Sequence, residues 1–182
     1  MSNFNLLNRI PVGPKPPKEI YCLVEIPKGA TNKYEYDHKF DAFRLDRVLY
    51  EAVFYPTEYG IIPRTLNEAD GDPLDVMVPS SFSTFPGCVL ACRPIGMLRL
   101  LDCGEQDNKI IAAPCDDPRF NEVKELDDLA SHFKKEIKNF WENYSEIQPG
   151  KKIKVEGWSG KEAAYETIKK AAANYQKASK KS

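Results

Sequence analysis

The sequence is poor in histidine and has no long apolar run. Its 182 residues include only two histidines, His38 and His132, and no stretch of 18 consecutive apolar residues. A histidine-based metal site or catalytic triad is therefore not favoured, and both histidines are interpreted as structural or surface residues. A membrane-spanning helix is excluded for lack of length. The N-terminus also lacks the basic-then-apolar pattern of a secretory signal. We expect a cytoplasmic protein with no membrane partner.

An excess of charge of one sign is lacking too. The 26 basic and 27 acidic residues give a formal net charge of −1, so no global field attracts nucleic acid, and we expect no nucleic-acid partner. The five cysteines are odd in number and contain no CxxC pair; Cys88 and Cys92 are closest, without a second pair to complete a zinc site. They are predicted to be small apolar residues in a reducing compartment.

The length fits one domain, residues 1–182, with a proline-rich N-terminal arm at 1–19 and a polar tail at 176–182. The arm is expected to be extended. Patterns typical of strands fill the first two thirds of the chain, and helical periodicity follows over 127–144 and from Gly160. This order predicts the α+β class, with a small closed five-stranded antiparallel β-barrel (OB-like) and flanking C-terminal helices.

The expected strands share runs of β-branched and aromatic residues between Pro and Gly stops. They cover 20–26, 33–37, 43–49, 76–79, 88–94, 95–101, 110–113 and 153–158. The segment 54–63 carries two prolines and a glycine and is predicted to be irregular. Asp127 or Asp128 is the expected N-cap of the first long helix, and Asp116 and Asp117 are expected to be turn residues.

Two charged residues occur at positions in these strands where the neighbouring residues are apolar. Glu25 lies within the run IYCLVEI, where an ionised carboxylate is costly unless it has a partner, so it either points out of the sheet or lies in a polar site. Arg47 shares a face with Leu45 and Leu49. It is therefore a better candidate for lining a polar cavity than Arg44, which is expected to be solvated.

The segment Glu68–Val78, read as EADGDPLDVMV, places three aspartates within six residues. Gly71 and Pro73 preset the loop between Asp70, Asp72 and Asp75. Crowded oxygen ligands on a stiff loop suit a hard cation such as Mg²⁺, although an acidic turn without a metal has the same composition. An EF-hand is excluded because its sixth loop position, which requires glycine, is Asp75.

A second acidic turn occurs between two predicted strands, with Asp102, Asp107 and Lys109 inside DCGEQDNK. Carboxylates of both turns gathered at one barrel mouth would repel one another unless protonated or neutralised by divalent cations. With Lys33 and Arg47 added, the site would be rich in both metal and positive charge, which suits a compact phosphate-bearing polyanion. Two metals can also activate one water for attack on phosphorus.

These motifs resemble the soluble family I inorganic pyrophosphatases of bacteria and archaea. The loop DGDPLDV fits the family signature D-[SGDN]-D-[PE]-hydrophobic-D at every defined position. Matching segments follow the family's order and spacing: VEIPKG, NKYE, LDRVLY, FYPTEYG, CRPIG, DNKIIAAP and KVEGW. The resemblance covers about Ile20 to Trp158. It implies a five-stranded barrel with flanking helices, Mg²⁺-dependent hydrolysis of pyrophosphate to two phosphates by a metal-activated water, and a homohexamer.

The resemblance also implies a role for each matched residue. Asp70, Asp75 and Asp107 would hold the tightly bound Mg²⁺, with Asp75 bridging to a second ion. Asp102, Asp107 and Glu35 would help to bind the ions that arrive with pyrophosphate, several per site, with Mn²⁺ as a substitute. Asp72 would accept the proton of the attacking water. The substrate would contact Lys33, Arg47, Tyr59 and Tyr144, with Lys109 close by, and Glu25 and Tyr55 would support the site.

One position departs from the family pattern. Members commonly carry lysine after the tyrosine that aligns with Tyr144, whereas this chain has Ser145. The hypothesis is weaker substrate binding, or replacement of the missing cation by Lys151 or Lys152.

Two other functions remain open at this point. Small barrels of this kind also serve as non-catalytic modules that bind oligonucleotides or oligosaccharides. Such a module needs a basic groove with aromatic residues, not clustered aspartates. The second alternative is an enzyme that acts on polyphosphate or a nucleoside triphosphate, but neither a P-loop nor GxGxxG is present.

Overall fold

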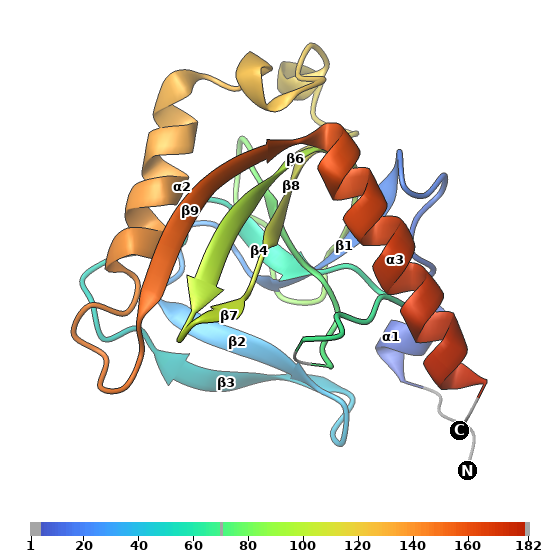
Figure 1. The fold of residues 1–182 in the computed structure, drawn as a ribbon, viewed down its shortest axis with the longest axis horizontal. Coiled ribbons are helices and arrows are strands. Elements are labelled where there is room, and N and C mark those ends of the chain that lie inside the picture. Colours follow the sequence, from blue (N-terminus) through green and yellow to red (C-terminus); the bar gives the residue numbers. More distant parts are fainter. Residues whose placement is uncertain (1–4, 70, 181–182) are drawn as a thin grey trace.

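The computed structural model describes residues 5–69 and 71–180. In this part of the chain, five strands pair into a closed ring, because β1 pairs with both β4 and β6 (Figure 1). In order around the ring they are β1 (Ile20–Ile26), β4 (Glu58–Ile61), β5 (Asp75–Val78), β8 (Lys109–Pro114) and β6 (Val89–Asp102). The predicted α+β class and five-stranded closed barrel are confirmed. One pair, β5 with β8, is parallel and not antiparallel as expected.

The two faces of the ring strands pack against different helices. On β5, Val76 and Val78 lie in the apolar cluster that contains Ile168 of α3 (Lys161–Ser179), whereas Met77 lies in the cluster of α2 (Ser131–Asn143). This alternation follows from the two-residue period of a strand. Trp141 of α2 donates its indole N–H to the Met77 sulfur at 3.2 Å. The C-terminal helices thus cover both faces of the strand that follows the first acidic loop.

Strand β6 is continuous where two strands were predicted. It runs from Val89 to Asp102, and its register against β8 shifts between Pro94 and Gly96. Because proline cannot donate to a ladder, an irregularity at Pro94 lets the strand pass through that residue. Beyond the ring, β6 also pairs with β7 (Glu105–Gln106) and β9 (Ile153–Gly160).

The segment predicted to be irregular, 54–63, contains strand β4. Its first residue, Glu58, is fully buried, and its carboxylate accepts hydrogen bonds from the backbone N–H and hydroxyl of Thr84 and from the Ser80 hydroxyl. These partners offset the cost of burying the charge, so the strand can begin at a glutamate.

Strands β2 (Asn32–Asp37) and β3 (Ala42–Val48) form a separate antiparallel hairpin. No ladder pairs it with the ring among the described residues. Figure 1 shows it beside the end of the ring at which β7 is found.

The helical termini differ from the sequence-based expectation. The carboxylate of Asp128 accepts the N–H groups of Lys124 and Glu125 and closes a short 3₁₀ turn, η2 (Leu126–Asp128). Helix α2 therefore begins only at Ser131. Helix α3 continues to Ser179, into the tail that was expected to be frayed. A second 3₁₀ turn is η1 (Pro118–Phe120), capped by Asp117.

The N-terminal arm, expected to be extended, contains the short helix α1 (Leu6–Arg9). The Asn5 side chain accepts the Asn8 N–H, which is the usual way to begin a helix. Between residues 5 and 180, apart from residue 70, no helix is long and apolar enough to cross a membrane.

Candidate functional site

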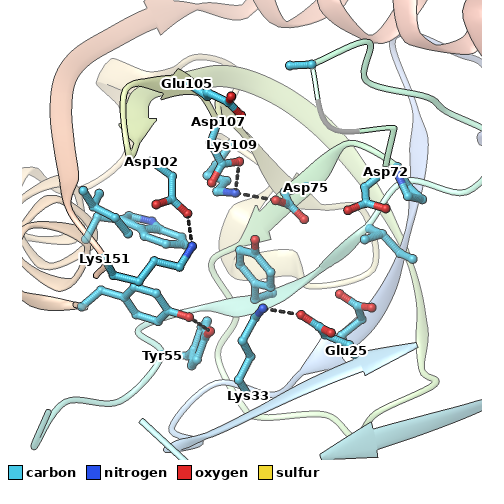
Figure 2. Close-up of a pocket in the computed structure, with 18 of the residues that line it drawn as sticks. Glu25, Lys33, Tyr55, Asp72, Asp75, Asp102, Glu105, Asp107, Lys109 and Lys151 are labelled. Atoms are coloured by element: carbon cyan, nitrogen blue, oxygen red, sulfur yellow. Dashed lines mark hydrogen bonds and ion pairs between the residues drawn. The ribbon is translucent and has the colours of Figure 1, made fainter. Parts of the chain in front are cut away.

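A cavity of about 470 Å³ lies between the hairpin and the ring, and polar side chains dominate its walls (Figure 2). Every predicted site residue that the structure describes lines it: Glu25, Lys33, Glu35, Arg47, Tyr55, Tyr59, Asp72, Asp75, Asp102, Asp107, Lys109 and Tyr144. Asp70 lies outside the described residues. The two acidic turns therefore meet, although 27 positions separate Asp75 from Asp102 in the sequence.

The parallel pairing of β5 and β8 explains why the turns meet. Each acidic turn leads directly into one of these strands, and Val76 is in register with Ile110. Parallel neighbours begin at the same edge, so Asp75 and Lys109, the first residues of their strands, lie side by side. An antiparallel pair would have placed the two turns at opposite ends of the ring.

Lys109 lies at the centre of this acidic edge. Its ammonium group is almost fully buried and forms ion pairs with both Asp75 and Asp107 (Figure 2). It also lies 5.2 Å from the centroid of the Trp141 ring. Burial by itself acts to lower the pKa of Lys109, but the two carboxylates outweigh it and raise that pKa above its usual value. The lysine therefore stays protonated in the absence of other cations.

A second lysine neutralises Asp102. Lys151, from the segment before β9, donates to one carboxylate oxygen at 2.5 Å. Burial acts to raise the pKa of Asp102, but this hydrogen bond and charge lower it overall. The other oxygen, Oδ1, is buried and has no hydrogen-bond partner.

The donor set fits a hard cation. No three histidine, cysteine or carboxylate side chains within 5–69 and 71–180 are placed as a ready metal cluster, and the ammonium groups of Lys109 and Lys151 are paired with Asp75 and Asp102. The carboxylates of both turns nevertheless offer oxygen donors, and the buried Oδ1 of Asp102 is an acceptor that lacks a donor. Ligands of this type suit Mg²⁺ or Mn²⁺ rather than Zn²⁺.

The opposite wall is cationic and phenolic. On β3, Arg47 donates to the Tyr144 hydroxyl at 2.9 Å, and the hydroxyls of Tyr144 and Tyr55 are 3.4 Å apart. On β2, Lys33 forms ion pairs with Glu35 and, at 3.5 Å, with Asp46. Arg47 and Lys33 are both partly buried, with the side chains 22% and 23% exposed. Two cationic side chains, Lys33 and Arg47, thus lie across the cavity from the two acidic turns.

Two buried tyrosines, Tyr55 and Tyr59, also line the cavity. Burial, followed by the neighbouring Asp75 carboxylate, raises the pKa of Tyr59 well above its ordinary value. Burial and Tyr144 do the same for Tyr55. Both phenols therefore remain protonated donors at neutral pH.

Glu25 has the polar partner that the sequence left open. It is buried and accepts the backbone N–H of Tyr36 at 2.8 Å, so it links β1 to β2. Burial raises its pKa from 4.5 to about 8, partly offset by that hydrogen bond. In the metal-free protein, the folded state holds this proton over a range in which the unfolded state has lost it.

We therefore expect the free energy of unfolding of the metal-free protein to fall as the pH rises from about 4.5 to 8, since the folded state binds the additional proton. Glu25→Gln, which cannot ionise, should remove this slope and be more stable than the wild type at pH 8 by about 2 to 4 kcal/mol. Urea unfolding in EDTA at pH 5 and pH 8 measures both. Parallel pH dependence of the two proteins would contradict the assignment.

Several lining residues were not predicted as site residues. His38, expected at the surface, is exposed and lies at the cavity rim. Cys103, Glu105 and Gln106 join the wall because the β6–β7 turn carries them with Asp102. Trp141 was assigned to the core of α2, which is confirmed, but it also reaches the cavity. No spacing in the sequence signals these positions, because the turn and the helix packing create them.

Comparison with known proteins identifies the family of this chain. The family model for inorganic pyrophosphatase matches residues 22–176. The chain belongs to the inorganic pyrophosphatase family. It is 45% identical over 175 residues to the inorganic pyrophosphatase of Picrophilus torridus (96% of this chain, 98% of that protein). With that of Geobacillus stearothermophilus it shares 48% over 158 residues (87% and 94%).

Solved structures agree. The crystal structure of inorganic pyrophosphatase from Thermus thermophilus superposes with a TM-score of 0.88 at 41% identity, covering 92% of this chain and 97% of that one. As a member of the inorganic pyrophosphatase family, the chain is a diphosphatase, and the family resemblance drawn from its motifs is confirmed.

Proposed function

We propose that this chain hydrolyses pyrophosphate to two phosphates in a Mg²⁺-dependent reaction in which Asp72 accepts the proton of the attacking water. The observation that carries the proposal is the single cavity in which both acidic turns face Lys33 and Arg47. Carboxylates on one side provide for cations, and cationic side chains on the other bind a polyanion.

Asp75 and Asp107, which line the cavity and share Lys109, would hold the resident ions. The family resemblance adds Asp70, which lies outside the described residues. Asp102 and Glu35 would take ions that enter with the substrate. Bound Mg²⁺ supplies Lewis acidity, which acidifies water and neutralises phosphate charge, and Mn²⁺ can serve in its place. On ion binding, Lys109 and Lys151 would release carboxylate oxygens that they now occupy.

Asp72 is suited to proton transfer by its location. It lies on the exposed loop before β5, three residues from Asp75, and lines the cavity at a point that solvent reaches (Figure 2). Asp75 and Asp107 share the buried lysine, whereas Asp72 belongs to the water-accessible rim. A carboxylate there can take a proton from water and return it to solvent.

Substrate contacts come from the hairpin, from β4 and from the residue that follows α2. Lys33 and Arg47 carry fixed positive charge toward the cavity, and Tyr59 and Tyr144 supply phenolic donors. Arg47 has a buried Nε without a hydrogen-bond partner, which a phosphate oxygen would satisfy. These groups bind pyrophosphate and orient it toward the acidic turns. Lys109 lies close to the substrate, and Glu25 and Tyr55 are supporting residues of the site.

The test is phosphate release from pyrophosphate, ATP and tripolyphosphate, each measured with Mg²⁺ and again with EDTA. We expect rapid release from pyrophosphate with Mg²⁺ or Mn²⁺, slow release from the other two, and loss of activity on chelation. Undiminished activity in EDTA would contradict the metal dependence. A preference for ATP or tripolyphosphate would contradict the substrate, and binding without turnover would indicate a binding module.

The cavity lining supports Lys151, rather than Lys152, as the replacement for the family's lysine at position 145. Ser145 is buried, Lys151 lines the cavity, and Lys152 is exposed outside it. We therefore expect Lys151→Met to raise KM for pyrophosphate at saturating Mg²⁺ by about five- to tenfold, because it removes one charge-assisted hydrogen bond. Lys152→Met is the matched control and should leave KM unchanged.

The same hypothesis predicts that Ser145→Lys lowers KM without a change in reaction type. Steady-state kinetics of the three variants and the wild type decide this. Equal KM values for Lys151→Met and Lys152→Met, or no improvement in Ser145→Lys, would count against a compensating Lys151.

The family resemblance further leads us to propose a homohexamer located in the cytoplasm. Size-exclusion chromatography with mass measurement tests the assembly, and a mass other than six chains would contradict it.

A further inference from the structure

The hairpin that carries the substrate-binding cations needs an anchor. Lys33 lies on β2 and Arg47 on β3, and these strands form no ladder with the ring in the described residues. A two-stranded hairpin is marginally stable by itself. Something else must fix the distance between these cations and the acidic turns, because an error of about 1 Å in placement weakens a binding site.

The N-terminal segment 5–10 provides such an anchor. The backbone N–H of Leu6 lies 3.0 Å from the Tyr36 hydroxyl of β2 and 2.9 Å from Oδ1 of Asp41 at the hairpin turn. The Tyr36 hydroxyl donates to that same oxygen. Leu7, 4% exposed, packs in one apolar cluster with Tyr36 of the hairpin and with Leu23 and Ile61 of the ring.

The segment is itself held by the ring side of the molecule. The Asn8 carbonyl accepts from the Arg64 guanidinium, in the loop after β4, and the Asn8 side chain accepts from the Tyr175 hydroxyl of α3. Figure 1 shows α1 between the hairpin and the end of α3. Segment 5–10 therefore connects the hairpin turn to the body of the protein.

Tyr36 is the residue at which these contacts converge. Its hydroxyl meets the N-terminal segment, its ring lies in the shared apolar cluster, and its backbone N–H donates to the buried Glu25 of β1. The next residue toward the site on β2 is Glu35, and Lys33 lies two further on. A displacement of Tyr36 is thus passed directly to the cation-bearing strand.

We propose that segment 5–10 is a positioning element of the active site, and that it acts through the Tyr36 hydroxyl to hold Lys33 and Arg47 at the correct distance from the acidic turns. Tyr36 also lines the cavity, but its hydroxyl is engaged by the Leu6 N–H and Asp41. In this scheme that hydroxyl does not bind substrate, and Tyr36 is a positioning residue. The inference rests on the proposed function, because the readout is substrate affinity.

The test compares two identical chemical changes on one strand. Tyr36→Phe removes the hydroxyl that contacts the N-terminal segment. Tyr34→Phe removes a hydroxyl whose hydrogen bond, from Asn32 at 2.9 Å, stays inside the hairpin. We expect Tyr36→Phe to raise KM for pyrophosphate about fivefold with kcat changed by less than about twofold, since binding is lost equally in the ground and transition states. Tyr34→Phe should change neither constant.

Leu7→Ala and Leu7→Met add a second pair. Alanine opens the shared cluster and should raise KM as Tyr36→Phe does, and methionine, which refills the space, should restore it. Unchanged KM in Tyr36→Phe and Leu7→Ala would overturn the proposal. If both variants lost kcat with no change in KM, the proposal would also be overturned, since that result indicates an effect on the chemical step and not on the placement of the cations.

Hydrogen exchange separates this inference from the proposed function. In Tyr36→Phe, amides of β2 and β3 should exchange faster while those of β4 and β5 keep their wild-type rates. If the wild type failed to hydrolyse pyrophosphate, the proposed function would fall, but this exchange pattern would still support the anchor. Wild-type exchange rates in the hairpin of Tyr36→Phe would overturn the anchor whatever the activity.

Discussion

Replacing Asp72 with asparagine is expected to lower kcat for pyrophosphate hydrolysis by about 10²- to 10⁴-fold while Mg²⁺ affinity changes little. The amide keeps the size and one oxygen of the carboxylate, but it cannot accept a proton at neutral pH. Asp72 lies on the exposed rim of the cavity, away from the buried lysine that Asp75 and Asp107 share. Its loss therefore removes proton transfer and not ion binding.

Calorimetric titration with Mg²⁺ and steady-state kinetics separate the two effects. Asp116→Asn is the matched control, since Asp116 is exposed and lies outside the active-site cavity. It should behave as the wild type does. If Asp72→Asn lost metal affinity and regained full kcat at high Mg²⁺, the assignment of Asp72 as the proton acceptor would be wrong.

Asp75→Ala should have the opposite signature, a loss of Mg²⁺ affinity of about 100-fold or more. Asp75 begins the strand that is parallel to β8, so its carboxylate lies beside that of Asp107, and both contact the Lys109 ammonium group. Removing it leaves Asp107 and Lys109 as a neutral pair with little attraction for a divalent cation. Activity should be recovered in part by raising the Mg²⁺ concentration.

The control is Asp117→Ala, which removes an aspartate that caps η1 and binds Ser81 at 2.5 Å, outside the catalytic cavity. Its Mg²⁺ affinity should match that of the wild type. Unaltered Mg²⁺ binding by Asp75→Ala, or an equal loss in both variants, would contradict a metal site at the edge shared by β5 and β8.

Part of the cavity lining could be predicted because its residues are local signals in the sequence, and the other predicted residues were implied by the family resemblance of the motifs. The DGDPLDV loop indicates oxygen ligands for a metal ion, and Glu25 and Arg47 are charged residues among apolar neighbours. The structure brings each of these residues that it describes to one cavity. Strand β1 was predicted with its observed bounds, since Pro27 and Gly29 follow an unbroken apolar run.

What the sequence could not show depends on pairing between distant segments. The parallel register of Val76 with Ile110 has no local signal, yet it brings the acidic turns together. Strand β4 was missed because the prolines and glycine of 54–63 indicated an irregular segment. The partners that allow it to begin at the buried Glu58, Ser80 and Thr84, are more than 20 positions away. The role of Lys109 as the common partner of two aspartates follows from the same parallel pairing.

The most direct test of the account is to locate Mn²⁺ by anomalous diffraction in crystals of the protein grown with MnCl₂. We predict ions in the cavity between the 71–75 and 102–107 segments, within coordination distance of both Asp75 and Asp107, with Lys109 withdrawn from at least one of them. Ions bound to only one of these segments, or found only outside this cavity, would contradict it.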